Sequence, residues 1–310
     1  MRPNRDDYVL LLLLGLVWGF SFLLVKVAVG AVPPITVAAG RIVIGAAALA
    51  LFLHVRGGRW PTDRRDWIKL VAMGFVGNVL PFSLISWGQM HIDSGLSAIL
   101  MAAIPLSTIL IAHVFAPDEP LSTGKLAGVA LGIAGIIVLV GPSALEGLRT
   151  EVIAELAVVA ATVCYAVNAV IARHLSRVSV EAIGAGCLVP AAIMILPFSA
   201  VLEHPWQAHP TTVAIVAVIA LGLVSTAGGY LLLFRLIARA GAGFASLNNF
   251  LVPLFGVLWG MLFLGERPGA HAFLALCLVL AGLAAPRLWP ALVGLRPPRQ
   301  PERPSTSAIE

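Results

Sequence analysis

Polar side chains are rare inside the long apolar runs of this sequence, and these few could bind or orient a ligand. Arg41 lies about eight residues inside such a run, where a charge costs several kcal/mol unless it is paired or hydrated. An arginine at that depth suits a ligand with a carboxylate, and gating or structural pairing is the alternative. The other polar side chains at mid-depth are Ser21, Asn78, Ser83, Ser107, Asn168, Thr226, Tyr230, Ser246, Asn248 and Asn249.

Tryptophans accompany two of the three patterns that let helices pack closely. Small residues four apart allow two helix backbones to approach in lipid, and helix packing is our interpretation of all three patterns. Trp18 precedes the second glycine of the first pattern, and we expect it to line a cavity. Trp259 has the same place in the third pattern, where packing is favoured. The patterns are Gly15-x-x-x-Gly19, Gly128-x-x-x-Gly132 and Gly256-x-x-x-Gly260.

Three prolines lie beside several of the mid-depth polar residues. A proline frees carbonyl groups that lipid cannot satisfy, so a break at Pro81, Pro105 or Pro253 belongs beside a cavity. Asn248 and Asn249 form the densest polar cluster, for which substrate contact and interhelical hydrogen bonding are both open. The expected substrate-binding residues are Trp18, Ser21, Arg41, Asn78, Tyr165, Asn168, Tyr230, Asn248 and Asn249.

The apolar runs lack the residues of several known chemistries. No carboxylate lies near the middle of a run, since Glu155 is about one turn from an end and Glu266 closes a run. No H-E-x-x-H pattern is present, and Ser122-Thr123-Gly124-Lys125 lacks the upstream glycine of a phosphate-binding loop. His113, the one histidine well inside a run, has no evident partner. We therefore expect no catalytic residue, no metal site and no cofactor, and an intramembrane enzyme is disfavoured.

The overall composition requires a hydrocarbon environment. Hydrophobic residues make up 59% of the chain and charged residues 11%, whereas soluble domains are about half apolar and a quarter charged. A spanning helix takes about 20 apolar residues, so we predict an all-α membrane protein with ten transmembrane helices. The expected spans are 8–29, 33–54, 67–87, 94–115, 122–141, 152–173, 181–202, 211–233, 243–264 and 269–288.

Basic residues gather on one side of these ten spans. Sixteen of the 20 Lys and Arg residues fall on the side of the N-terminus, and only Arg149 and Arg267 fall on the other. Lys and Arg are in excess on the cytoplasmic side of membrane proteins, so we expect both termini to be cytoplasmic. Residues 289–310 are rich in proline and charge, which predicts a disordered cytoplasmic tail.

The second half of the chain repeats the first. A shift of 148 residues places Pro105 on Pro253, and a shift of 147 places Trp18 on Tyr165. Each half, 8–141 and 152–288, holds five spans, an odd number, so the second copy must cross the membrane in the opposite direction. Inverted repeats of this kind are typical of secondary transporters, with the site near the middle of the membrane.

Short motifs in both halves suggest a family. The first span contains Trp18-Gly19-Phe20-Ser21-Phe22, the second contains Arg41, and the ninth closes with Leu264-Gly265-Glu266-Arg267-Pro268. With these motifs the chain resembles the EamA-type family of the drug/metabolite transporter superfamily over about residues 8–288. In the first half Ala116-Pro117-Asp118-Glu119 stands where the closing motif would be. The resemblance implies two inverted five-helix repeats and transport of small molecules, which in this family range from amino acids and sugars to drugs.

These observations favour a secondary transporter that moves a small organic metabolite across the inner membrane by alternating access. An amino acid or derivative is the favoured substrate and export the favoured direction. A multidrug efflux carrier is the alternative, and a passive channel or scramblase is less favoured. The expected partners are a small-molecule substrate and the lipid bilayer. Nucleic acid is not expected, and a homodimer stays open.

Reporter fusions test the predicted topology. A reporter active only in the cytoplasm, joined to either terminus, should give signal, because sixteen basic residues lie on that side. A reporter inserted beside Arg149 should be silent. A C-terminal fusion that reports the opposite side would contradict the ten-span prediction.

Overall fold

Helices make up all the regular structure in the described part of the chain. The computed structural model describes residues 3–115, 122–144, 149–175 and 177–292. Within these residues, ten stretches of helix are long and apolar enough to cross a membrane, so the protein is an integral membrane protein. The helices are α1 (Arg5–Val29), α2 (Pro34–Val55), α3 (Arg64–Gly74), η1 (Phe75–Val79), α4 (Leu80–His91), α5 (Ser94–Met101), α6 (Ile104–Phe115), α7 (Thr123–Ala144), α8 (Thr150–Ala172), η2 (Arg173–Leu175), α9 (Val180–Glu203), η3 (Pro205–Gln207), α10 (Thr212–Ala220), η4 (Leu221–Gly228), α11 (Gly229–Ala240), α12 (Ala242–Ala245), α13 (Asn248–Leu264) and α14 (Ala270–Leu292).

The prediction of an all-helical protein with ten spans is confirmed. Span ends differ from the predicted ones by a few residues, as expected where helix ends are read from composition. The last helix continues to Leu292, past the predicted end at residue 288. The tail 293–310 and the acidic pair Asp118 and Glu119 lie outside the described residues, so the expectations for them stay predictions.

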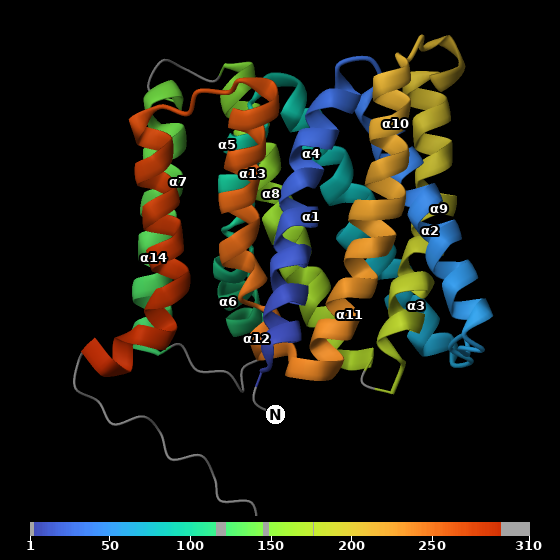
Figure 1. The fold of residues 1–310 in the computed structure, drawn as a ribbon, viewed down its shortest axis with the longest axis horizontal. Helices are drawn as coiled ribbons and strands as arrows, with labels where there is room; N and C mark the ends of the chain where they lie inside the picture. Colours follow the sequence, from blue (N-terminus) through green and yellow to red (C-terminus); the bar gives the residue numbers. More distant parts are fainter. Residues whose placement is uncertain (1–2, 116–121, 145–148, 176, 293–310) are drawn as a thin grey trace, which may run out of the picture.

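Helices of the first half pack mainly against helices of the second half. In Figure 1 the pair α7 and α14 forms one edge of the bundle, and α2, α3 and α9 lie toward the other edge. The contacts come in matched pairs, since α1 packs on α13 as α8 packs on α6, and α2 packs on η4 as α9 packs on α3. This is the arrangement that an inverted repeat predicts, and the superposition of the two halves stays a prediction.

Four of the spans contain an irregular stretch of helix. Two contain π-helical turns, η1 and η4, which begin 146 residues apart. Two others break: the helix stops at Ala102–Ala103 before Pro105, and again at Ser246–Leu247 before Pro253. Tight backbone bonds three residues apart, such as Ala102 N to Ile99 O at 3.1 Å and Leu247 N to Phe244 O at 3.0 Å, cross these breaks. The break predicted at Pro105 is thus observed just before that residue, whereas Pro253 lies inside the continuous helix α13, six residues after the turn at Ser246–Leu247.

Two helices that begin on the side opposite the N-terminus, here called the distal face, take their caps from other helices. The first residues of α2 and α5 receive no capping bond from their own N-cap side chains, Pro33 and Asp93. Glu203, at the end of α9, instead accepts from the backbone N of Ile35 at 2.9 Å and Thr36 at 2.7 Å. A carboxylate at a helix N-terminus satisfies free amides and suits the helix dipole.

Glu266 supplies the corresponding cap to α5. Its carboxylate accepts from the Ser94 N and Oγ, both at 2.8 Å, and from Gly95 N at 2.9 Å. Burial raises the pKa of the neighbouring Asp93 carboxyl; Glu266 raises it further and Lys26 lowers it. The Lys26 ammonium donates to the carbonyl oxygens of Gln89 at 2.9 Å and Ile92 at 2.8 Å. These bonds join the distal ends of the first, third, fourth and ninth spans.

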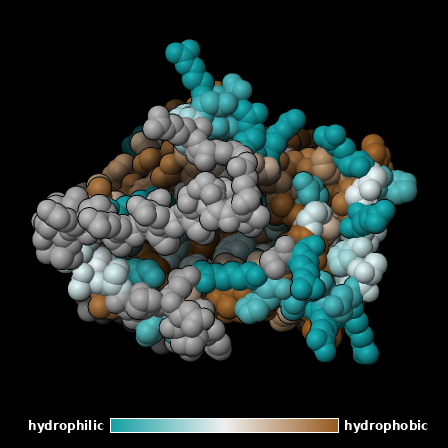
Figure 2. All heavy atoms as spheres, turned by 90° about the horizontal axis from the view of Figure 1, so that it is seen from below, coloured by the Kyte–Doolittle hydropathy of each residue, from teal (hydrophilic) through white to brown (hydrophobic). Residues whose placement is uncertain are grey.

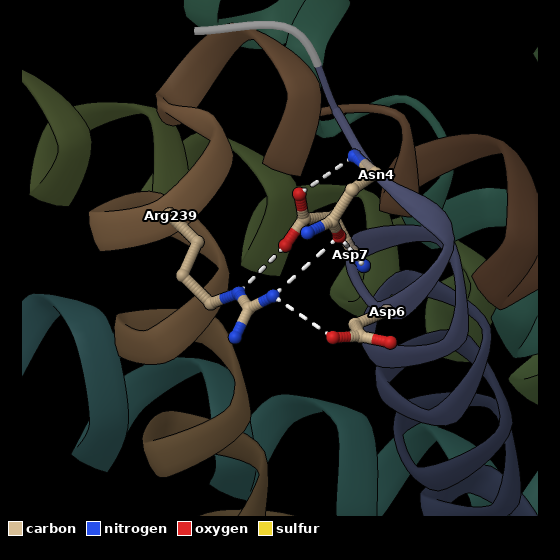
Figure 3. A network of polar contacts seen from close by, with 4 residues as sticks. All are labelled: Asn4, Asp6, Asp7 and Arg239. Carbon is tan, nitrogen blue, oxygen red and sulfur yellow. Dashed lines mark hydrogen bonds and ion pairs between the residues drawn. The ribbon is translucent and has the colours of Figure 1, made fainter.

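A charged network joins α1 to α11 on the face that carries the N-terminus, here called the N-terminal face (Figure 3). The Arg239 Nε donates to Asp7 Oδ1 at 2.7 Å, and its Nη2 lies 3.3 Å from Asp6 Oδ2. Asn4 and Asp7 form a capping box at the start of α1. Figure 2 shows this face, where hydrophilic side chains gather and apolar ones are visible in the recess between them.

The cap from Glu203 generates a test of stability. Glu203→Ala removes three hydrogen bonds, to Ile35 N, Thr36 N and Thr36 Oγ1, and should lower the free energy of unfolding by about 1–3 kcal/mol. Glu203→Gln keeps a neutral acceptor and should cost less. Thermal unfolding of the purified protein in detergent measures both. Unfolding of Glu203→Ala at the wild-type temperature would contradict the cap.

Candidate functional site

A cavity of about 350 Å³ lies in the middle of the bundle. It is lined from seven of the ten spans, and all four irregular spans contribute. Six of these spans are the predicted first, third, fourth, sixth, eighth and ninth; the second span adds Arg41. The lining residues are Trp18, Ser21, Phe22, Val25, Arg41, Phe82, Ile85, Met101, Ala102, Ile104, Tyr165, Asn168, Ser225, Thr226, Tyr230, Leu233, Asn248, Asn249, Val252 and Pro253.

Most of the residues predicted to bind substrate meet around this cavity. Asn78 alone among the nine is not in the lining. Its side chain is 1% exposed and accepts a long hydrogen bond of 3.5 Å from the Tyr230 hydroxyl. Asn78 thus lies outside the lining and contacts the lining residue Tyr230. The eight in the lining are Trp18, Ser21, Arg41, Tyr165, Asn168, Tyr230, Asn248 and Asn249.

Arg41 is the one cationic side chain of the lining. Its Nε donates to Thr226 Oγ1 at 3.0 Å, and its guanidinium lies 3.7 Å from the centre of the Phe82 ring. A cation over a ring face is stabilised, more so when it is desolvated. Among the described residues no carboxylate lies within ion-pair distance of Arg41. Its positive charge is therefore held by neutral groups.

The π-helical turn η4 makes the Arg41 contact possible. Its extra residue per turn lets the Thr226 hydroxyl donate to the Leu221 carbonyl oxygen, five residues back, at 2.8 Å. The same hydroxyl oxygen then accepts from Arg41. Single π-turns inside α-helices are frequent at functional sites.

Trp18 is fixed on the same turn. Its indole Nε1 donates to the Ser225 carbonyl oxygen at 3.1 Å. The ring lies so close to Gly229 that a Cβ at that position would overlap the indole nitrogen. In the other half, a Cβ on Gly77 of η1 would overlap the amide of Asn168. Each π-turn region thus holds a glycine that receives a lining side chain from the other half.

Several buried polar atoms of the lining have no partner. Both amide atoms of Asn248 lack a hydrogen bond, although the residue is 2% exposed. The Asn168 Oδ1 and the Ser225 Oγ are unpaired as well. A buried polar group without a partner costs about 1–3 kcal/mol, so a cluster of them beside a cavity is the mark of a site that a ligand or water completes.

Some lining residues were not predicted from the sequence. Phe22, Phe82 and Met101 read as ordinary apolar residues of a span. Thr226 is polar and lies in the middle of a predicted span. Its hydrogen bond with Arg41 depends on the π-turn η4, which the sequence did not predict. Ser107, another mid-depth residue, pairs with Thr162 at 2.8 Å between helices and lies outside the lining.

A second cavity of about 430 Å³ adjoins the first. It lies between α6, α8, α13 and α14, with Ser246 from the turn before α13, and shares Ile104 and Asn249 with the central cavity. Its walls are mainly apolar, and Arg287 is its one charged residue, with its Nη2 donating to Ser246 Oγ at 2.8 Å. The described residues contain no cluster of three metal-ligating side chains in either cavity.

Comparisons with known proteins agree with this architecture. A family model described as the EamA-like transporter family matches residues 7–141 and again residues 152–285. An Escherichia coli (strain K12) protein named "Probable amino-acid metabolite efflux pump" is 29% identical over 90% of this chain and 94% of its own length. A Streptantibioticus cattleyicolor protein named "Probable terminal-alkyne amino-acid exporter" is 26% identical over 91% and 93%.

A solved crystal structure shares the fold. It superposes with a TM-score of 0.66 at 23% sequence identity, covering 93% of this chain and 99% of that chain. At this identity the likeness concerns the fold alone.

The unpaired amide of Asn248 gives a test of whether it serves structure or a ligand. Asn248→Leu removes two unpaired polar atoms beside an open space, so the unfolding temperature should stay equal or rise. Thr226→Val is the matched comparison: it breaks two made hydrogen bonds and should cost about 1–3 kcal/mol. Thermal unfolding measures both, and a large loss of stability in Asn248→Leu would show that Asn248 is structural.

Proposed function

The chain belongs to the EamA-like transporter family, and from this membership and its central cavity we propose that it is a secondary transporter of a small organic metabolite. The favoured substrate is an amino acid or derivative, and the favoured direction is export. The proposed membrane is the inner membrane, with both termini in the cytoplasm. The protein is proposed to be a carrier and no enzyme; a homodimer stays open.

The observation that carries this proposal is the unpaired polar lining of the central cavity. Asn248 has no partner for its amide and Arg41 no partner for its charge among the described residues. Hydrocarbon cannot satisfy such groups, so they require water or a ligand. A cavity with aromatic walls and a few polar groups is the usual form of a small-molecule site.

Alternating access would then open one face while the other stays closed. The distal face is held by the caps from Glu203 and Glu266. The N-terminal face is held between α1 and α11 by Asp7 and Arg239 (Figure 3). The helix breaks after α5 and α12 lie at the level of the cavity and are proposed as hinges, because a few residues at element ends can absorb such changes.

The names of two relatives support an amino acid or derivative as the substrate. Two of the relatives carry names that refer to amino acids or their metabolites. For this chain, the aromatic rings of Trp18, Tyr165 and Phe82 would hold the apolar part of the substrate. The amides would fix its orientation, and Arg41 would hold a carboxylate.

The second cavity favours one alternative, a multidrug efflux carrier. Its apolar walls share Ile104 and Asn249 with the central cavity, so an amphiphilic compound could occupy both spaces. A passive channel or scramblase is less favoured, because inverted repeats of this kind are typical of secondary transporters.

Two substitutions test the site. Trp18→Ala and Asn249→Ala should each cut transport at least tenfold in proteoliposomes supplied with a panel of radiolabelled amino acids and acylated derivatives, because each removes a lining group. Membrane insertion should be unchanged, since neither residue is needed to bury a helix. Trp206→Ala, at a residue that is 67% exposed on the distal side, is the control and should transport normally. Normal transport by both lining variants would refute the site.

A further inference from the structure

The lining of the central cavity carries a positive charge and no negative charge. Arg41 is its one charged residue, and every other polar group in its lining is a neutral amide, hydroxyl or indole. The described carboxylates all lie in loops or within six residues of a helix end, as Glu155 does in α8. None of them lines the cavity.

We infer that the substrate of this cavity, if it is the transport site proposed above, is a carboxylate with one net negative charge and no ammonium group. The favoured class is an N-acylated α-amino acid with an apolar side chain. The inference narrows the substrate class of the proposed function and depends on that function.

Charge balance is the first step of the argument. Bound to Arg41, a monoanion leaves the loaded cavity neutral. A zwitterionic amino acid brings an ammonium on the carbon next to its carboxylate, so the loaded cavity keeps one uncompensated positive charge close to the guanidinium. An unpaired charge taken out of water costs several kcal/mol, which disfavours the zwitterion.

The aromatic walls do not replace the missing carboxylate. The Phe82 ring already has the Arg41 guanidinium 3.7 Å from its centre. The indole of Trp18 is bonded to the backbone of η4. A cation over a ring face gains only a modest stabilisation, which does not offset an unpaired ammonium beside a like charge.

The unpaired amide supplies the second recognition element. Asn248 offers a free N–H donor and a free oxygen acceptor, and an acylamino group carries one of each. A secondary amide therefore matches Asn248 with no charge on either side. The apolar residues Phe22, Ile85 and Met101 in the lining suit an apolar side chain. The volume of about 350 Å³ is at the small end of ligand pockets, as one amino-acid-sized molecule requires.

Four related compounds that differ in their charged groups test this inference. N-acetyl-L-phenylalanine is the monoanion, L-phenylalanine the zwitterion, L-phenylalaninamide the cation, and N-acetyl-L-phenylalaninamide the neutral form. Binding to the purified wild-type protein is measured by thermal shift, and flux is measured in proteoliposomes. The monoanion should bind at least tenfold more tightly than each of the other three, and it should be the best transported.

A variant ties the preference to Arg41. Arg41→Gln should bind the neutral compound as tightly as the monoanion, so the preference disappears. Arg56→Gln is the matched control, because Arg56 is an exposed cation directly after the end of the same helix, 5.5 Å from the Phe52 ring, and should keep the preference. The wild-type comparison needs no variant, so a folding defect in Arg41→Gln leaves the test intact.

Two outcomes would overturn the inference. Equal or tighter binding of L-phenylalanine refutes the charge argument, and transport of that compound would at the same time support the proposed carrier. Binding of none of the four refutes the proposed substrate class, while the wider metabolite panel with the Trp18 and Asn249 variants decides the carrier function separately.

Discussion

The structure depends on one constraint: hydrocarbon offers no partner to a polar group. Continuous α-helix meets it for the backbone, so every irregularity has to lie against protein or beside the cavity. The breaks at Ala102–Ala103 and Ser246–Leu247 and the π-turns η1 and η4 follow this rule, since each lies in a span that lines the cavity. At the distal face the same need is met by Glu203 and Glu266, which satisfy the free amides of helices that do not cap themselves.

Much of the fold and of the site could be predicted from the sequence, because this constraint determines which residues are apolar and where polar ones occur. The ten spans follow from apolar length, and the break at Ala102–Ala103 follows from Pro105. Most polar residues of the lining could be predicted from their position within a span alone. An amide in the middle of a span cannot be satisfied by lipid and must therefore face protein or a cavity. Asn78 shows the limit of that reasoning: its amide is buried behind Tyr230, and depth does not separate a lining residue from one in the layer behind.

The other features of the site could not be predicted from the sequence, because they depend on how the helices pack in space. Phe82 is an ordinary apolar residue in the sequence, and only the packing of α2 on η4 and α4 brings Arg41 over its ring. The partner of Arg41, Thr226, lies 185 residues away. A shift of 147 places Arg41 on Leu188, which is a fully buried core residue. Within the described lining, the charge of the site thus belongs to the first half of the chain alone.

The interleaving of the halves has a consequence for how the protein is made. α7 packs mainly on α14, and α1 on α13, so their partners emerge from the ribosome only after most of the other spans have been made. At about 5–20 residues per second, α7 waits roughly seven to thirty seconds for a partner that begins 147 residues later. During that time Gly128, which meets the Gly282 backbone in the finished protein, borders lipid or the insertion machinery. The first five helices therefore enter the membrane as an unfinished assembly, and the central cavity exists only after α13, which supplies its last lining residues, has been made.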